Sequence, residues 1–166
     1  MREVKSIEEL FAEGRLSRIS ELELPRYVNF FENSYKDNLE HAKANQESFP
    51  RWGIISGYYA MHDITKLLLA RNFRLKVELK VHETTIMALS ELIKDRGLVN
   101  LLEKGYSEFM QLANDLAEAK WERTKVQYYT GTEFMREQYR KTASLFIRTT
   151  VEPYLQSINR LVEVRK

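Results

Sequence analysis

Apolar side chains recur every three or four residues along most of the chain, a spacing typical of helices that bury one face. Ser6 and Glu9 have the spacing of a capping box, which predicts a short first helix ending near Gly14. Pro25 and Pro50 predict the starts of two long helices, because proline is favoured in a first helical turn. The N-terminal half is therefore expected to be helical.

The C-terminal half continues the helical spacing. A long helix is predicted over about residues 82–96, stopping at a glycine, and a short helical piece over 98–104 leads to a further glycine. Another long helix follows, and the sequence at 130–133 is expected to break it and to cap the last helix. Pro153 lies inside the pattern of that last helix, so a kink or a break is predicted near residues 149–150.

One segment departs from helical spacing. Residues 75–81 alternate apolar and charged side chains as a strand does, but no other segment does so, and we expect an extended loop. The chain is therefore predicted to be all-α, an up-and-down bundle of four to five helices. It is expected to be a single domain over 1–166, with residues 1–24 an N-terminal extension carrying a short helix and residues 25–166 the bundle.

The amino-acid composition excludes several classes of function and of site. The 166 residues include 43% hydrophobic and 30% charged side chains with a net charge of +2, which is a globular profile without a strong nucleic-acid footprint. Cysteine is absent, so disulfides, thiolate catalysis and cysteine zinc sites are excluded. No apolar run is long enough to span a membrane and no signal-peptide core is present, so no membrane contact and a cytoplasmic location are expected.

The helix predicted after Pro50 is apolar on nearly every side, which is typical of a helix at the centre of a fold. Titratable groups in such a helix are either paired for structural reasons or carry the function. Tyr59, His62 and Lys66 are three and four residues apart and share one helix face, with Asp63 beside them. This face suits contact with a phosphate or a nucleotide.

Each of these residues also has a structural explanation. The adjacent Tyr58 and Tyr59 can be core side chains, and His62 can be a hydrogen-bonded core histidine. His82 either caps the start of its helix or binds a ligand at the rim of the bundle. Arg51 either lies on a solvated face or joins an anion site. No two histidines have the helical spacing of metal ligands, so neither a metal nor a cofactor is expected.

Three segments in order, Tyr58–Leu69, Val81–Leu89 and Arg123–Tyr129, resemble motifs of one known family. Tyr58–Leu69 is similar to the central Tyr-Tyr-Ala helix of the HEPN domains (higher eukaryotes and prokaryotes nucleotide-binding), in the branch of small stand-alone prokaryotic members. Val81–Leu89 resembles the family's helix start at a histidine, and Arg123–Tyr129 is similar to a segment before its last helix. The resemblance covers roughly residues 25–155 and implies an all-α fold.

The resemblance also has implications for function. Many HEPN proteins are metal-independent ribonucleases whose motif is an arginine, four to six residues, and a histidine. Here Arg74 and His82 have seven residues between them, so the motif is absent and the chain is not expected to be an enzyme of this kind. Small non-catalytic members are thought to bind nucleotides or to pair with a minimal nucleotidyltransferase as toxin–antitoxin-like partners.

The sequence therefore predicts a HEPN-like helical module that binds a nucleotide or RNA, as a homodimer and as the partner of a minimal nucleotidyltransferase. Two alternatives stay open: a metal-independent ribonuclease using Arg74 with His82, and a purely structural protein-interaction module. The candidate ligand-binding residues are Arg51, Tyr59, His62, Asp63, Lys66 and His82.

Overall fold

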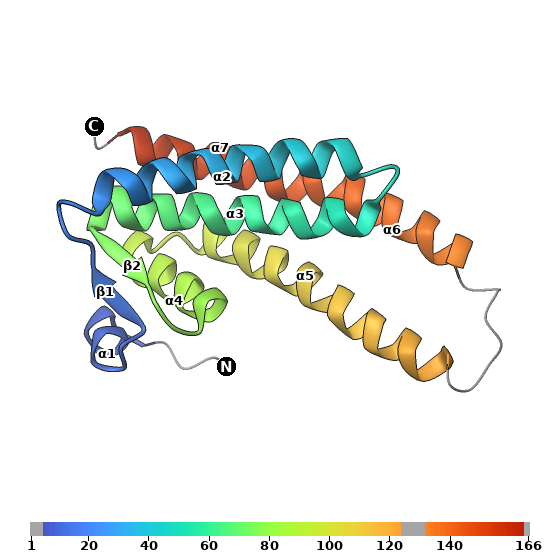
Figure 1. The fold of residues 1–166 in the computed structure, drawn as a ribbon, viewed down its shortest axis with the longest axis horizontal. Helices are drawn as coiled ribbons and strands as arrows, with labels where there is room; N and C mark the ends of the chain where they lie inside the picture. Colours follow the sequence, from blue (N-terminus) through green and yellow to red (C-terminus); the bar gives the residue numbers. More distant parts are fainter. Residues whose placement is uncertain (1–4, 124–131, 165–166) are drawn as a thin grey trace.

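The computed structural model describes the backbone of residues 5–123 and 132–164 and the side chains of residues 5–114 and 136–164. The fold is all-α apart from one pair of short strands, as predicted (Figure 1). The element bounds are α1 Ile7–Ala12, β1 Leu16–Arg18, α2 Leu24–Asn45, α3 Pro50–Phe73, β2 Leu75–Val77, α4 Val81–Ile93, α5 Arg96–Arg123, α6 Thr132–Phe146, η1 Ile147–Val151 and α7 Glu152–Glu163.

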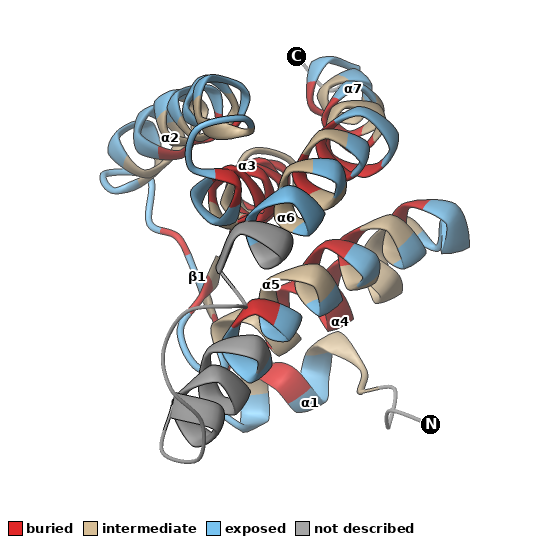
Figure 2. Cartoon of the chain, turned by 90° about the vertical axis from the view of Figure 1, so that its right-hand side faces the viewer, coloured by how far each residue is buried: buried red, intermediate tan, exposed pale blue. Residues whose placement is uncertain are grey.

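Helix α3 is the centre of the molecule. It contacts α2, α4, α5, α6 and α7, and Figure 2 shows its buried residues surrounded by these helices. Pro50 is at its first turn, as predicted, and most of its residues from Gly53 to Ala70 are buried. Gly53 permits α2 to come close, because a Cβ at this position would lie 3.1 Å from the backbone Cα of Gln46. A helix that is apolar on all sides is stable only when other elements cover it in this way.

The prediction that residues 75–81 form an unpaired loop is wrong. β2 pairs with β1 in antiparallel register, Leu16 opposite Val77 and Arg18 opposite Leu75. The partner strand lies in the N-terminal extension and has three residues, which is too short for its alternation to be recognised. Leu16, Leu75 and Val77 are buried in a small separate core that also contains side chains of α1 and α4. The strands therefore fasten the N-terminal extension to the helices.

Two helix boundaries also differ from the prediction. The helix predicted to stop at Gly97 is α4, which ends earlier, at Ile93. Lys94, and not Gly97, takes the left-handed conformation that ends it (φ 55°). α5 begins at Arg96 and continues through Gly105, where a helix start was expected. A Cβ on Gly105 would lie 2.9 Å from Sδ of Met61, so this glycine allows α5 to pack closely on α3 and does not end a helix.

The kink or break predicted near residues 149–150 coincides with an interruption of the α-helix by a π-helical turn. α6 passes into a π-helical turn, η1, and then into α7, whose first turn holds the proline. An inserted residue in a π turn relieves the backbone conflict that proline causes inside a helix. The predicted break at residues 130–133 falls largely on residues 124–131, which lie outside the described part of the chain; α6 begins at Thr132.

Candidate functional site

Tyr58 and His82 form the centre of the candidate site. Tyr58 lies on α3 and is completely buried, and its phenol oxygen is 2.6 Å from Nδ1 of His82 in the first turn of α4. The His82 ring stacks on Tyr106 of α5, with centroids 5.4 Å apart and planes 16° apart. Phe109, one turn further along α5, stacks on Tyr58 with centroids 5.0 Å apart. Helices α3, α4 and α5 thus meet at this pair.

His62 lies one helical turn beyond Tyr58, and its ring centroid is 5.0 Å from that of His82. Its Nε2 is 3.3 Å from Oγ1 of Thr85 on α4. Its Nδ1 is 3.7 Å from the Asp63 carboxylate, beyond hydrogen-bond distance, and has no hydrogen-bond partner among the described residues. The two imidazoles therefore lie in contact, one buried and one half-buried.

The electrostatic environment keeps these rings neutral. Burial lowers the pKa of His62, and the charge of Lys66 lowers it further against the opposing effect of Asp63. Burial also lowers the pKa of His82, as do His62 and Lys66. Burial raises the pKa of the Tyr58 phenol. At neutral pH the site is consequently a set of uncharged, hydrogen-bonded rings.

We call six neighbouring rings the aromatic cluster: those of Tyr58, Tyr59, His62, His82, Tyr106 and Phe109. Four of its members are only partly buried, and they lie on three different helices: Tyr59, His82, Tyr106 and Phe109. The ring of Tyr59 meets His82 and Phe109 edge-on, at centroid distances of 6.1 and 5.7 Å. Partly exposed rings that pack against buried neighbours are held in fixed positions.

The side of α3 next to the aromatic cluster faces α2. Asp63 is nearly buried there, and its Oδ2 accepts hydrogen bonds from Ser34 (2.7 Å) and Asn38 (3.0 Å). The ammonium of Lys66 lies 5.0 Å from the centre of the Phe31 ring and is half-buried. Asp63 therefore anchors α2 to α3, while the charge of Lys66 lowers the pKa of both imidazoles.

The structure brings three of the predicted residues together in the aromatic cluster: Tyr59, His62 and His82. Lys66 lies one helical turn beyond His62, with its ammonium over the Phe31 ring of α2. Asp63 lies beside them but turns toward α2. Arg51 is exposed at the start of α3, eleven residues before His62 and so about 16 Å away along the helix axis. Arg74 ends α3 in the left-handed conformation and pairs with Glu21, about 18 Å beyond His62 along the axis. The structure does not bring Arg74 and His82 together.

Two parts of the site were not predicted from the sequence. Tyr106 and Phe109, three residues apart on α5, complete the aromatic cluster, and their helical spacing was the available signal. Arg15 is 97% buried and joins the N-terminal extension to α4 through hydrogen bonds to Thr84 (2.8 Å) and Glu83 (2.9 Å). Nothing in the local sequence around Arg15 indicates this role.

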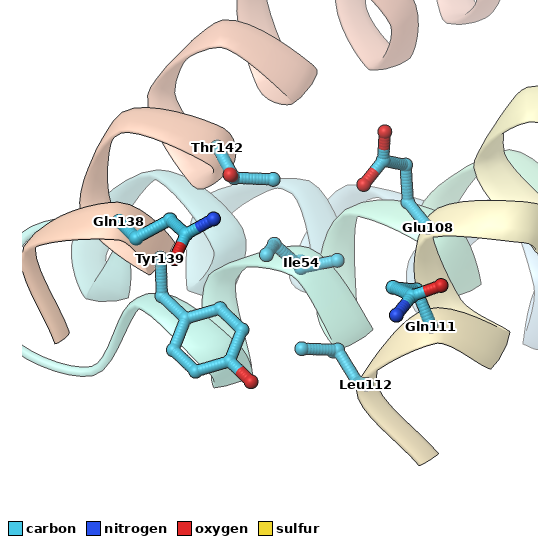
Figure 3. A pocket seen from close by; sticks show the side chains of 7 residues that line it. All are labelled: Ile54, Glu108, Gln111, Leu112, Gln138, Tyr139 and Thr142. Carbon is cyan, nitrogen blue, oxygen red and sulfur yellow. The ribbon is translucent and has the colours of Figure 1, made fainter. Parts of the chain in front are cut away.

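A separate pocket of about 220 Å³ lies where α3, α5 and α6 meet (Figure 3). Ile54 of α3 lies between its two walls, and polar side chains of α5 and α6 line them. Glu108 borders this pocket, whereas the next residue, Phe109, belongs to the aromatic cluster. The pocket therefore lies next to the aromatic cluster along α5, and none of the six rings lines it.

A scan against protein-family models and searches of curated proteins and of solved structures found no match to this chain. Within the described residues, no group of three or more His, Asp or Glu side chains could hold a metal ion. None of the described helices combines the length and the apolar character needed to cross a membrane. The function that the site supports therefore has to be inferred from the aromatic cluster and the charges around it.

Proposed function

We propose that this chain is a HEPN-like helical module that binds a nucleotide or a single strand of RNA in the cytoplasm, with a base on the aromatic cluster. The observation that carries the proposal is the gathering of four partly exposed rings over the buried Tyr58–His82 hydrogen bond. Unstacked bases bind to proteins by stacking on Tyr, Phe and His side chains. Uncharged rings in fixed positions suit this mode.

Lys66 provides the phosphate contact in this proposal. It lies on the same face of α3 as Tyr59 and His62, and its charge lowers the pKa of His62 and His82. Burial lowers the pKa of Lys66 itself, and a phosphate beside the ammonium would favour its charged form. Base stacking and one charged contact together are sufficient for a weak, salt-dependent interaction with RNA.

Binding is proposed here without cleavage. A ribonuclease of the HEPN family needs an arginine beside its histidine. Arg74 lies at the C-terminal end of α3, away from His62 and His82, and pairs there with Glu21. Among the described residues, the hydrogen bonds and ion pairs of His62 and His82 involve Tyr58, Thr85 and Asp63 and no arginine. An RNA incubation without metal tests this point, since cleavage abolished by His82→Ala would support the ribonuclease alternative.

The resemblance extends the proposal to partners. A homodimer and a complex with a minimal nucleotidyltransferase, in a toxin–antitoxin-like pair, are the partners that it implies. Light scattering at micromolar concentration tests the homodimer, and a monomer mass throughout that range would contradict it. Co-expression with a nucleotidyltransferase encoded next to this chain tests the complex.

Titration of a fluorescently labelled single-stranded RNA tests the binding proposal. Affinity is expected to fall as salt rises, and Lys66→Ala should reduce the log–log slope by about 0.7, the value for one phosphate contact on a single strand. Tyr59→Ala should weaken binding by about tenfold, since stacking contributes about 1–3 kcal/mol per base. Phe49→Ala, which removes an exposed ring at the start of α3, is the control and should bind as the wild type does. Absence of binding at low salt would contradict the proposal.

A further inference from the structure

The pocket between α3, α5 and α6 has a different chemistry from the aromatic cluster. Its lining includes one carboxylate, Glu108, and two carboxamides, Gln111 and Gln138. Tyr139 and Thr142 add hydroxyl groups. None of the described residues that line it is Lys, Arg or His. The described lining thus carries one negative charge, on Glu108, among neutral groups that can both donate and accept hydrogen bonds.

The placement of these groups favours a ligand with a charged tip and an apolar stem. Figure 3 shows Glu108 and Gln111 on the α5 wall, and Gln138 and Thr142 on the α6 wall. Ile54 and Leu112 are almost completely buried and present apolar surface between the two walls. A cavity of about 150 Å³ is enough to bind benzene, so about 220 Å³ accommodates a short alkyl chain with a polar end.

From this geometry we infer that the pocket binds a small organic cation, an alkyl amine or alkyl guanidine. The cationic group pairs with the Glu108 carboxylate and with amide and hydroxyl oxygens around it, and the methylene stem lies on Ile54 and Leu112. Hydrogen bonds that join a cation to a carboxylate are shorter and stronger than neutral ones, so Glu108 dominates the affinity. An anion such as a phosphate is disfavoured, because the described lining offers it no positive charge.

The test is calorimetric titration of the whole protein with 1,4-diaminobutane, and with 1,4-butanediol as the uncharged ligand of the same length. The diamine should bind at millimolar concentration and the diol should not. Glu108→Gln should weaken diamine binding by about tenfold or more, the loss of one charged hydrogen bond. Thr142→Leu, which fills the pocket without removing its charge, should weaken it as well. Glu40→Gln, the same substitution on the exposed face of α2, is the control and should leave binding unchanged.

Three results would overturn the inference: no diamine binding, equal binding of diamine and diol, or equal losses in Glu108→Gln and Glu40→Gln. RNA binding by the aromatic cluster should be the same in Glu108→Gln and in the wild type, because Glu108 is not one of the six rings and none of these rings lines the pocket. The two proposals can therefore fail separately.

Discussion

The phenol oxygen of Tyr58 lies 2.6 Å from Nδ1 of His82, and this contact joins the central helix to the first turn of α4. The ring of Tyr58 has no exposed surface, so its hydroxyl depends on His82 for its hydrogen bond. The same contact fixes the orientation of the half-buried imidazole, which presents its face to Tyr106. The proposed base-binding surface thus depends on a buried hydrogen bond.

Tyr58→Phe should lower the free energy of unfolding by about 1–2 kcal/mol, because the hydrogen bond is lost and a nitrogen of the half-buried His82 loses its partner. Urea unfolding followed by circular dichroism measures this. Tyr59→Phe removes a hydroxyl from the half-buried neighbour and should change stability by less than about 0.5 kcal/mol. Equal losses in the two variants would show that the Tyr58–His82 hydrogen bond does not stabilise the fold.

Stability should fall on acidification because of the buried imidazoles. The pKa of His62 is lower in the folded protein than its ordinary value of about 6.5 in the unfolded chain, chiefly through burial. Above about pH 6.5 the ring is neutral in both states and no penalty exists. Below that pH the unfolded chain binds a proton that the folded protein excludes until its lowered pKa is reached. The free energy of unfolding should therefore fall by up to about 1.4 kcal/mol per pH unit.

Urea unfolding between pH 5 and 8 measures this slope. His62→Gln should flatten it, because the variant lacks the buried imidazole whose pKa is lowered. A slope that His62→Gln does not change would mean that other groups cause the acid sensitivity.

Gly53→Ala should separate α2 from α3. The added Cβ would lie 3.1 to 3.3 Å from backbone atoms of Ala42 and Gln46, which cannot move without shifting the helix. We expect a loss of about 1–3 kcal/mol in the free energy of unfolding, despite the better helix propensity of alanine. Thermal unfolding measures this, with Gly97→Ala in the exposed first turn of α5 as the control. A stabilised Gly53→Ala protein would show that the helices have room there.

Arg15→Lys should loosen the N-terminal extension. The guanidinium donates to Thr84 and to Glu83 from a buried position, and a lysine ammonium cannot reproduce both bonds with the same geometry. The expected loss is about 1–3 kcal/mol, since a buried hydroxyl and a carboxylate lose their donor. Hydrogen exchange of the β1 amides should rise. Arg26→Lys, at an exposed position of α2, should leave both measurements unchanged. Unaltered exchange in β1 of Arg15→Lys would contradict this account of Arg15.

The sequence was sufficient to predict those features that depend on neighbours along one helix. Tyr59, His62 and Lys66 share a face of α3 because spacings of three and four residues place them there. The contact between Tyr58 and His82 could not be predicted from the sequence, because it depends on how α4 packs back onto α3 after β2. β1 was not predicted because three residues are too few to show an alternating pattern. A helix break was wrongly expected at Gly105, because the local sequence does not show that this glycine allows α5 to pack closely on Met61.

Nuclear magnetic resonance of the protein with ¹⁵N-labelled histidine is the most direct test of the central proposal that a base binds on the aromatic cluster. The chain has 3 histidines, and His82 and His62 lie in the cluster while His41 lies on α2 beside Ser56. On addition of a short single-stranded RNA at low salt, the ring signals of His82 should shift most, those of His62 less, and those of His41 least. Tyr59→Ala should reduce the His82 shift at the same RNA concentration. Unchanged ring signals of His82, or a shift confined to His41, would contradict the proposal.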